Sequence, residues 1–262
     1  MTLDLYQIDT FTNQPFKGNP AAVCPLDEWL NDELMQHIAN ENNLSETVFF
    51  VKNKSDYKIR WFTPTSEVDL CGHATLAAAY VLFNYLNYGV EAINFQSNSG
   101  NLRVIKSRDY YKLNFPSDQL KQVNLTDELT CPFSIKPIEA YKGKTDYLLV
   151  FEHEYHIKQL NPNLLELMKI EARGVIVTAK GNDCGFVSRF FGPRVGVDED
   201  PVTGSAHTSL IPYWSNRLNK GELTAKQLSK RGGELKCRLL GNRVEISGKA
   251  VTYLIGKINL NK

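Results

Sequence analysis

The stretch RWFTPTSEVDLCGHAT, Arg60–Thr75, decides how the chain folds, because a variant of it returns as RFFGPRVGVDEDPVTGSAHT, Arg189–Thr208. The first parts of the two stretches align at an offset of 129 residues (189 − 60). After about three extra residues in the second copy, Gly72 aligns with Gly204 at an offset of 132 (204 − 72). Since half of the 262 residues is 131, we predict two related halves of similar size.

Each copy has the same surroundings. A helical pattern and a β-rich run precede it, as in DELMQHIANENNLSETVFFVK and LLELMKIEARGVIVTAK. The residues that follow, 72–86 and 203–218, are apolar on nearly all sides, which predicts helices buried all round. We therefore predict an α+β fold of two pseudo-symmetric halves, 1–118 and 119–262, each a mixed β-sheet or barrel wrapped around its central helix. Whether the last strand returns to the first half stays open.

Composition excludes several classes of partner. Lys and Arg total 30 against 29 Asp and Glu, so there is no basic field to attract nucleic acid or an anionic membrane. No apolar run approaches 18 residues, and the amino terminus alternates like a strand instead of forming a signal peptide. The five cysteines include no C-x-x-C pair, which indicates free thiols in a reducing compartment. We expect a soluble cytoplasmic protein.

Small residues stand where both central helices begin, Gly72 in the first half and Gly204-Ser205 in the second. A helix start offers unpaired N–H groups and the positive end of the helix dipole. If the halves are related by two-fold symmetry, both starts point into one cleft, which would hold a carboxylate or an oxyanion. The alternative is that both glycines only form tight strand-to-helix turns.

Side chains that are not duplicated indicate where chemistry was added. Glu46 lies where a loop leads into a β-rich run. The matching position in the second half falls at Arg173-Gly174, so this carboxylate is not duplicated. His73 follows the first glycine, and Asp200 closes an acidic run before the second helix. This set suits acid–base catalysis, because a carboxylate and a histidine can exchange protons with a bound acid. Each residue taken alone also has a purely structural interpretation. Glu46 would be a surface carboxylate, His73 a histidine at a helix start, and Asp200 an aspartate that caps the helix.

The same residue types raise two further chemistries, a metal site and a thiol nucleophile. Cys71, His73, Asp198 and His207 include metal-ligand types, but their spacing matches no zinc pattern, so we predict no metal. A thiol nucleophile at Cys71, with His73 or His207 as its base, stays open, because a helix start lowers the pKa of a thiol.

The segments FTNQPFKGNPAAVC, NLSETVFF, RWFTPTSEVDLCGHAT, DYLLVF and DEDPVTGSAH resemble, over nearly the whole chain, the phenazine-biosynthesis protein PhzF family. The resemblance implies the fold of diaminopimelate epimerase and a homodimer. It also implies a cofactor-free isomerase that moves a proton on a small carboxylic acid. The characterised member acts on trans-2,3-dihydro-3-hydroxyanthranilate.

By motif, the resemblance assigns the catalytic roles to Glu46, His73 and Asp200. It assigns substrate binding to Ser45, Cys71, Gly72, Thr203, Gly204 and Ser205, with backbone amides of both helix starts around the carboxylate. Epimerase relatives use two cysteines, and the second loop here has none, which disfavours a two-thiol racemase. The alternatives are an epimerase that uses Cys71 with a non-thiol partner, or a non-catalytic small-molecule binding protein on the same fold.

Overall fold

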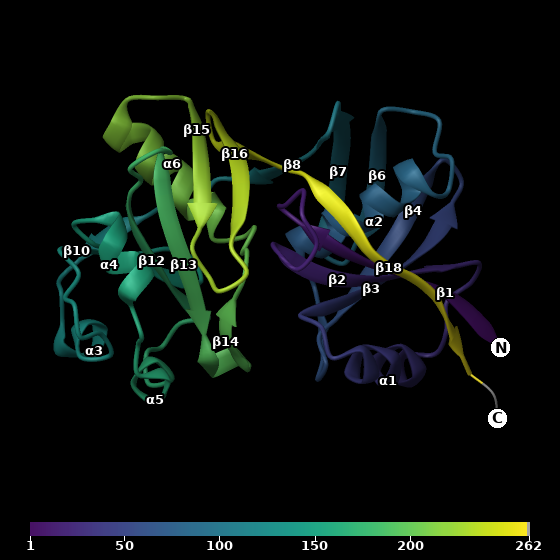
Figure 1. Ribbon diagram of the computed structural model, residues 1–262, viewed down its shortest axis with the longest axis horizontal. Coiled ribbons are helices and arrows are strands. Elements are labelled where there is room, and N and C mark those ends of the chain that lie inside the picture. Colours follow the sequence, from purple (N-terminus) through teal and green to yellow (C-terminus); the bar gives the residue numbers. More distant parts are fainter. Residues whose placement is uncertain (261–262) are drawn as a thin grey trace. The chain divides into compact units, whose positions relative to one another are not determined.

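The chain divides into two units in the computed structural model, which describes residues 1–260 (Figure 1). The first unit comprises Met1–Asn114 and Ser247–Lys262, and the second comprises Phe115–Ile246. The chain end belongs to the first unit because β18 (Ala250–Asn259) pairs antiparallel with β1 (Thr2–Thr10). The last strand therefore returns to the first unit, a point that the sequence had left open.

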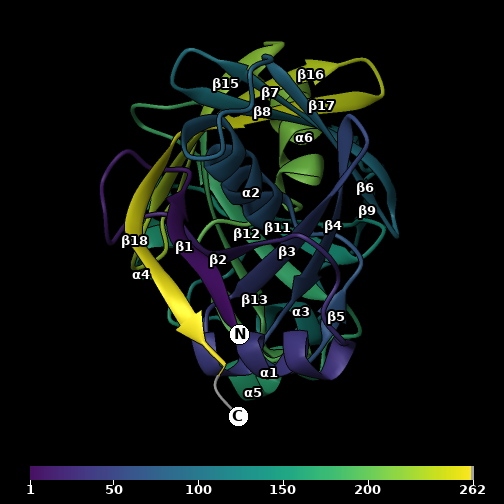
Figure 2. The ribbon, with the colours of Figure 1, turned by 90° about the vertical axis from the view of Figure 1, so that its right-hand side faces the viewer.

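The first unit is a mixed sheet around a buried helix, and Figure 2 shows β18, β1 and β2 side by side in it. β2 and β3 run parallel and are joined through α1; β3–β4, β4–β5 and β6–β7 are antiparallel, and β4 runs parallel to β6. Residues 47–51 of β3 are all buried, which is typical of a strand inside a parallel pair. Besides β1 and β18, the elements are β2 (Asn19–Leu26), α1 (Asp32–Asn42), β3 (Glu46–Asn53), β4 (Asp56–Phe62), β5 (Glu67–Val68), α2 (Gly72–Asn84), β6 (Ala92–Ser97) and β7 (Gly100–Ser107).

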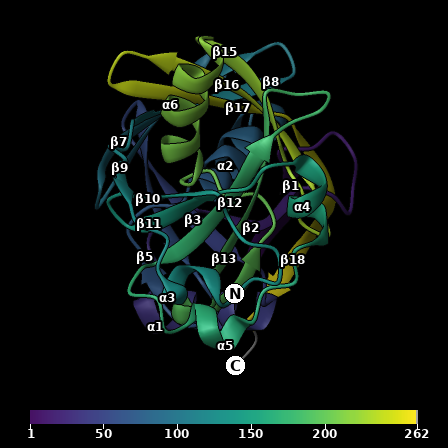
Figure 3. The ribbon, with the colours of Figure 1, turned by 90° about the vertical axis from the view of Figure 1, so that its left-hand side faces the viewer.

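The second unit has the same succession of pairings (Figure 3). β11 and β12 run parallel; β12–β13, β13–β14 and β15–β16 are antiparallel, and β13 runs parallel to β15. The elements are β9 (Lys121–Val123), α3 (Asp127–Thr130), β10 (Glu139–Lys142), β11 (Asp146–Val150), α4 (Glu154–Gln159), α5 (Leu164–Leu167), β12 (Gly174–Lys180), β13 (Phe186–Gly192), η1 (Pro193–Val195), β14 (Val197–Asp200), α6 (His207–Leu218), β15 (Glu222–Gln227) and β16 (Gly233–Leu240). The chain crosses between the units within β8 (Tyr110–Pro116) and β17 (Arg243–Gly248).

Both repeated stretches carry the same ion pair. Arg60 on β4 donates from Nε and Nη2 to the two carboxylate oxygens of Glu67, at 2.7 and 2.6 Å. Arg189 on β13 does the same to Glu199, at 2.7 and 2.9 Å. Each guanidinium also lies over the phenylalanine ring two positions further along, 5.1 Å and 4.8 Å from its centroid. Much of the repetition in the sequence therefore encodes scaffold, because each pair ties a strand to the segment that leads into the central helix.

The helix α2 is buried on almost every side, as the apolar pattern predicted; Leu76, Val81 and Leu82 are fully buried. It ends at Asn84, two residues before the predicted end at 86. The difference arises because the Leu86 N–H bonds back to the Val81 carbonyl at 3.3 Å, one residue beyond the helical spacing. Asn87 then takes a left-handed φ of 51°, which ends the helical path.

The helix α6 begins at His207, four residues after the predicted start at 203. The residues before it form tight turns, in which the His207 N–H bonds to the Gly204 carbonyl and the Thr208 N–H to the Ser205 carbonyl, each at 3.1 Å. Gly204 and Ser205 therefore precede this helix, and the predicted helix start at these residues is wrong. Pro212 lies inside α6 and has no N–H, so the Thr208 carbonyl instead accepts from a loop amide at 3.1 Å.

All five cysteines are free thiols, as their spacing predicted. Three of them, Cys24, Cys71 and Cys237, are buried. Within residues 1–260, no helix is both long enough and apolar enough to cross a membrane.

Candidate active site

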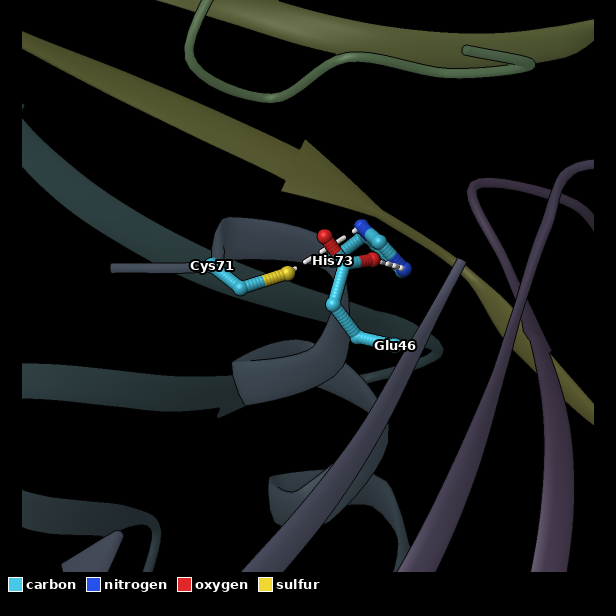
Figure 4. Close-up of side chains that lie close together, drawn as sticks. All are labelled: Glu46, Cys71 and His73. Carbon is cyan, nitrogen blue, oxygen red and sulfur yellow. Dashed lines mark hydrogen bonds and ion pairs between the residues drawn. The ribbon is translucent and has the colours of Figure 1, made fainter. Parts of the chain in front are cut away.

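Three of the predicted site residues gather in the first unit, where β3 begins beside the start of α2 (Figure 4). Glu46 is the first residue of β3, Cys71 precedes α2, and His73 is the second residue of that helix. Nε2 of His73 lies 3.1 Å from Oε2 of Glu46. The other ring nitrogen, Nδ1, lies 3.3 Å from Sγ of Cys71. The imidazole therefore stands between a thiol and a carboxylate.

The start of α2 explains why the thiol is free to face the ring. Cys71 occupies the N-cap position, but its side chain makes no capping hydrogen bond. The hydroxyl of Thr75 instead donates to the Cys71 carbonyl at 2.5 Å. Ser45 and Gly72, both predicted to bind the substrate, adjoin Glu46 and His73 in the chain and are half-buried.

Glu46 is more accessible to solvent than the histidine that it faces. Its side chain is 18% exposed, whereas that of His73 is 5% exposed. At 3.1 Å the two facing atoms are within ion-pair distance. Glu46 Oε2 and His73 Nε2 are both buried without a hydrogen-bond partner among the described residues. A buried polar atom without a hydrogen bond costs about 1–3 kcal/mol of folding free energy. A water, a ligand or a transferred proton at these two atoms would offset that cost.

The electrostatics separate the roles of the thiol and the imidazole. Burial raises the pKa of the Cys71 thiol to about 11, and the Glu46 carboxylate adds to the rise, while His73 opposes it only in part. Burial alone would lower the pKa of His73, but Cys71 and Glu46 together raise it well above its ordinary value. Because the thiol is neutral at pH 7, the charge of Glu46 is what sustains the imidazolium there. A thiolate nucleophile is therefore disfavoured.

Glu46, Cys71 and His73 are also metal-ligand types, and one atom from each lies within 4.8 Å of the others. Zinc needs about 2.0–2.3 Å to each ligand, so one ring nitrogen would have to face both partners. Here the sulfur faces Nδ1 and the carboxylate faces Nε2. Of the other two candidate ligands, Asp198 is exposed, and His207 directs Nδ1 to a backbone carbonyl at 2.9 Å. The arrangement fits a proton path better than a metal centre.

The remaining predicted residues lie in the second unit, from the end of β14 to the start of α6. The Thr203 hydroxyl donates to Oδ2 of Asp200 at 2.6 Å, and the Thr203 N–H donates to Oε1 of Gln227 at 2.8 Å. The hydroxyl of Ser205 accepts from Nη1 of Arg173 at 2.9 Å. Within this unit the structure joins Asp200 to Thr203 and places Ser205 against an arginine.

Sequence reasoning missed three polar residues of the second unit. Gln227 is 1% exposed and contacts Thr203. Arg173 donates from Nε and Nη2 to both oxygens of Asp146, whose side chain is 4% exposed. The sequence did contain a signal for Arg173, because this residue lies near the position of the second half that matches Glu46. It offered none for Gln227, because a glutamine at the end of a strand is indistinguishable from a solvated one.

The chain is similar to known proteins along nearly all of its sequence. The model of the family described as phenazine biosynthesis-like protein matches residues 8–256. An uncharacterized isomerase of Pseudomonas aeruginosa is 53% identical over 262 residues, with all of both chains covered. Related sequence therefore extends over the whole length, including both repeated stretches.

Solved structures agree on the architecture. A crystal structure from the phenazine biosynthesis protein PhzF family of Enterococcus faecalis has a TM-score of 0.97 and 46% identity, with 99% of this chain and 100% of the other covered. A hydroxyproline epimerase from Agrobacterium vitis has a TM-score of 0.67 at 11% identity, covering 100% and 93% of the two chains, which indicates a shared fold alone. The α+β fold predicted from the sequence, of the epimerase-like type, is confirmed.

Proposed function

The chain belongs to the family of phenazine biosynthesis-like proteins, and from that premise we propose that it is an isomerase that moves a proton on a small carboxylic acid without a cofactor. Glu46 is the general acid and base of this proposal, and His73 is its charged partner. The isomerase class is supported by the names of the relatives. The substrate class and the residue roles come from the resemblance and from the local geometry.

The observation that carries the proposal is the contact between Glu46 and His73. The carboxylate is partly exposed, so a ligand can reach it, and within residues 1–260 Oε2 and the facing Nε2 have no hydrogen-bond partner. The raised pKa of His73 keeps the imidazole charged beside the carboxylate. A carboxylate held in this way can accept a proton and give it back, and such acid–base catalysis contributes about 10²–10⁴-fold to a rate.

The proposed step moves one proton and needs no oxidant. The Glu46 carboxylate removes a proton from a carbon of the bound acid, and the electron pair of the broken C–H bond shifts into the π system that ends at the substrate carboxylate. The glutamic acid then returns the proton to a second carbon, where π electrons form the new C–H bond. Donors near the substrate carboxylate stabilise the charge that develops there.

We include the second-unit residues on the strength of the resemblance. Asp200 is proposed as a second proton-transfer residue, and the amides of Gly204 and Ser205 as carboxylate donors with those of Gly72 and His73. Thr203 contributes by its hydrogen bond to Asp200, at 2.6 Å. We also carry forward the homodimer and the cytoplasmic location that the sequence predicted, and sedimentation velocity measures the first of these.

The proposal is tested by exchange of deuterium from heavy water into candidate acids, beginning with trans-2,3-dihydro-3-hydroxyanthranilate and continuing with cyclic and amino acids. The expected result is exchange by the wild type that Glu46→Gln lowers by at least about a hundredfold. Saturable binding of an acid without any exchange would instead favour a non-catalytic binding protein. Exchange that survives in Glu46→Gln but stops in Cys71→Ala would favour the epimerase alternative.

A further inference from the structure

Gln227, the last residue of β15, contacts the turn that carries Asp200. Its amide oxygen accepts from the Thr203 N–H at 2.8 Å, and its amide nitrogen donates to the Asp200 carbonyl at 2.6 Å and to the Thr203 hydroxyl at 3.2 Å. The side chain is 1% exposed, so water does not compete for these bonds. We call Gln227, Thr203 and Asp200 with these hydrogen bonds the Gln227 clamp.

The clamp orients the hydroxyl proton of Thr203. Because the Thr203 hydroxyl accepts from the amide nitrogen of Gln227, its own proton is free to point elsewhere. That proton is donated to Oδ2 of Asp200 at 2.6 Å. The chain of bonds therefore runs from amide to hydroxyl to carboxylate, and it holds the Asp200 side chain as well as the backbone on both sides of Pro201.

The clamp has no counterpart among the described residues of the first unit. The strand registers of the two units place Gln227 where the first unit has Ser97, whose hydroxyl only closes a turn onto the Gly100 carbonyl at 2.8 Å. They likewise place Asp200 where the first unit has Val68. The arginine–glutamate pairs are present in both units and serve the scaffold, whereas the clamp was added in one unit, around a residue to which the proposed reaction assigns a role.

We propose that Gln227 is a positioning residue, which holds the Asp200 carboxylate in one orientation through Thr203. The link to catalysis rests on the proposed function, while the clamp itself is a property of the second unit. Without the amide, the Thr203 hydroxyl loses the donor that orients it, and its hydrogen bond to Asp200 is no longer held in one direction. The rest of the β13–β15 pairing is backbone bonding, which a side-chain substitution leaves in place.

The clamp is tested first without any substrate, by amide hydrogen exchange on the full-length chain. In Gln227→Met, exchange in residues 200–207 is expected to accelerate about tenfold, with β12 and β13 unchanged. Gln227→Glu keeps the acceptor for the Thr203 N–H and should give a smaller change. Gln159→Met, at the exposed end of α4, makes the same replacement away from the turn and should change nothing. Unchanged exchange at 200–207 in Gln227→Met would overturn the clamp.

The positioning role is tested by deuterium exchange into an acid that the wild type turns over. Asp200→Asn and Gln227→Met should each lower kcat by about tenfold or more with KM nearly unchanged, and the double variant should be no slower than Asp200→Asn. Losses that multiply would overturn positioning through Asp200. Full activity of Asp200→Asn would overturn it as well, but would leave the role of Glu46 standing. A wild type that exchanges no acid contradicts the proposed function and the positioning role, while amide exchange still decides the clamp.

Discussion

Nε2 of His73 lies 3.1 Å from Oε2 of Glu46, at a place where a strand start meets a helix start within one unit. Neither side chain alone points to chemistry, since buried histidines and strand-edge carboxylates are common. Together they form a close pair in which both facing atoms lack a hydrogen bond to any residue that the structure describes.

The charge state of His73 is a direct prediction. Because its pKa is raised well above 6.5, His73 should remain protonated at pH 7. A raised folded-state pKa contributes stability that is complete below the unfolded value and is lost as the pH rises through the folded one. Ring-carbon NMR titration should show that Glu46→Gln lowers the pKa of His73, whereas Glu41→Gln, an exposed carboxylate of α1, leaves it unchanged. A wild-type His73 that titrates at or below 6.5 would contradict this assignment.

His207 should make the chain less stable in mild acid. It is fully buried, its Nδ1 lies 2.9 Å from the Thr203 carbonyl, and burial lowers its pKa to about 4. A histidine with a depressed pKa contributes stability that is present above about pH 6.5 and is lost as the pH falls towards 4. The loss arises because His207 binds a proton in the unfolded chain at a pH where it stays neutral in the folded chain. The free energy of unfolding should drop by about 2 kcal/mol from this source between pH 7 and pH 5.

Urea unfolding at the two pH values measures this loss. His207→Gln keeps a donor for the Thr203 carbonyl and removes the titrating group, so its stability should depend less on pH. An equal loss in wild type and His207→Gln would show that other groups cause it.

Cys71 should be unreactive in the folded protein. Burial raises the pKa of its thiol to about 11, so almost none of it is thiolate at pH 7. Iodoacetamide should modify the exposed Cys131 first and leave Cys71 intact, as peptide mass spectrometry would show. Cys71→Ala should keep deuterium exchange within about tenfold of wild type. Stoichiometric alkylation of Cys71 that abolishes exchange would instead support the epimerase alternative.

The two duplicated ion pairs should differ in their value to stability. Arg189 is 12% exposed and also donates to two backbone carbonyls, at 3.2 and 2.6 Å, so Arg189→Met should cost about 3–5 kcal/mol of unfolding free energy. Arg60 is 22% exposed and its second partner, Asp32, is 77% exposed, so Arg60→Met should cost about half as much or less. Urea unfolding at pH 7 compares them, and equal costs would show that burial does not set the difference.

Much of the fold could be predicted because the chain encodes it twice. The repeat around Arg60 and Arg189, and the apolar segments after it, predicted the α+β class and the buried helices. The exact start of α6 could not be predicted, because the turn at Gly204 and the satisfaction of the Thr208 carbonyl opposite Pro212 depend on tertiary hydrogen bonds. Local pattern carries no information about such long-range partners.

Part of the candidate site could be predicted, where residue type and position already indicated chemistry. Glu46, Cys71 and His73 were named from the sequence, and the structure brings them together. The order Cys71–His73–Glu46 around the ring and the neutral state of the thiol depend on rotamers and burial, which the sequence does not show. Gln227 escaped notice because its importance comes from the turn that it contacts 24 residues away at Thr203.

The central claim is that Glu46 carries the moving proton, and exchange of deuterium into a bound acid tests it most directly. In heavy water the wild type should label the acid that it isomerises, and Glu46→Gln should label it at least about a hundredfold more slowly, while Glu41→Gln matches the wild type. If Glu46→Gln, folded and still able to bind the acid, labels it within about tenfold of the wild-type rate, the account of the site is wrong.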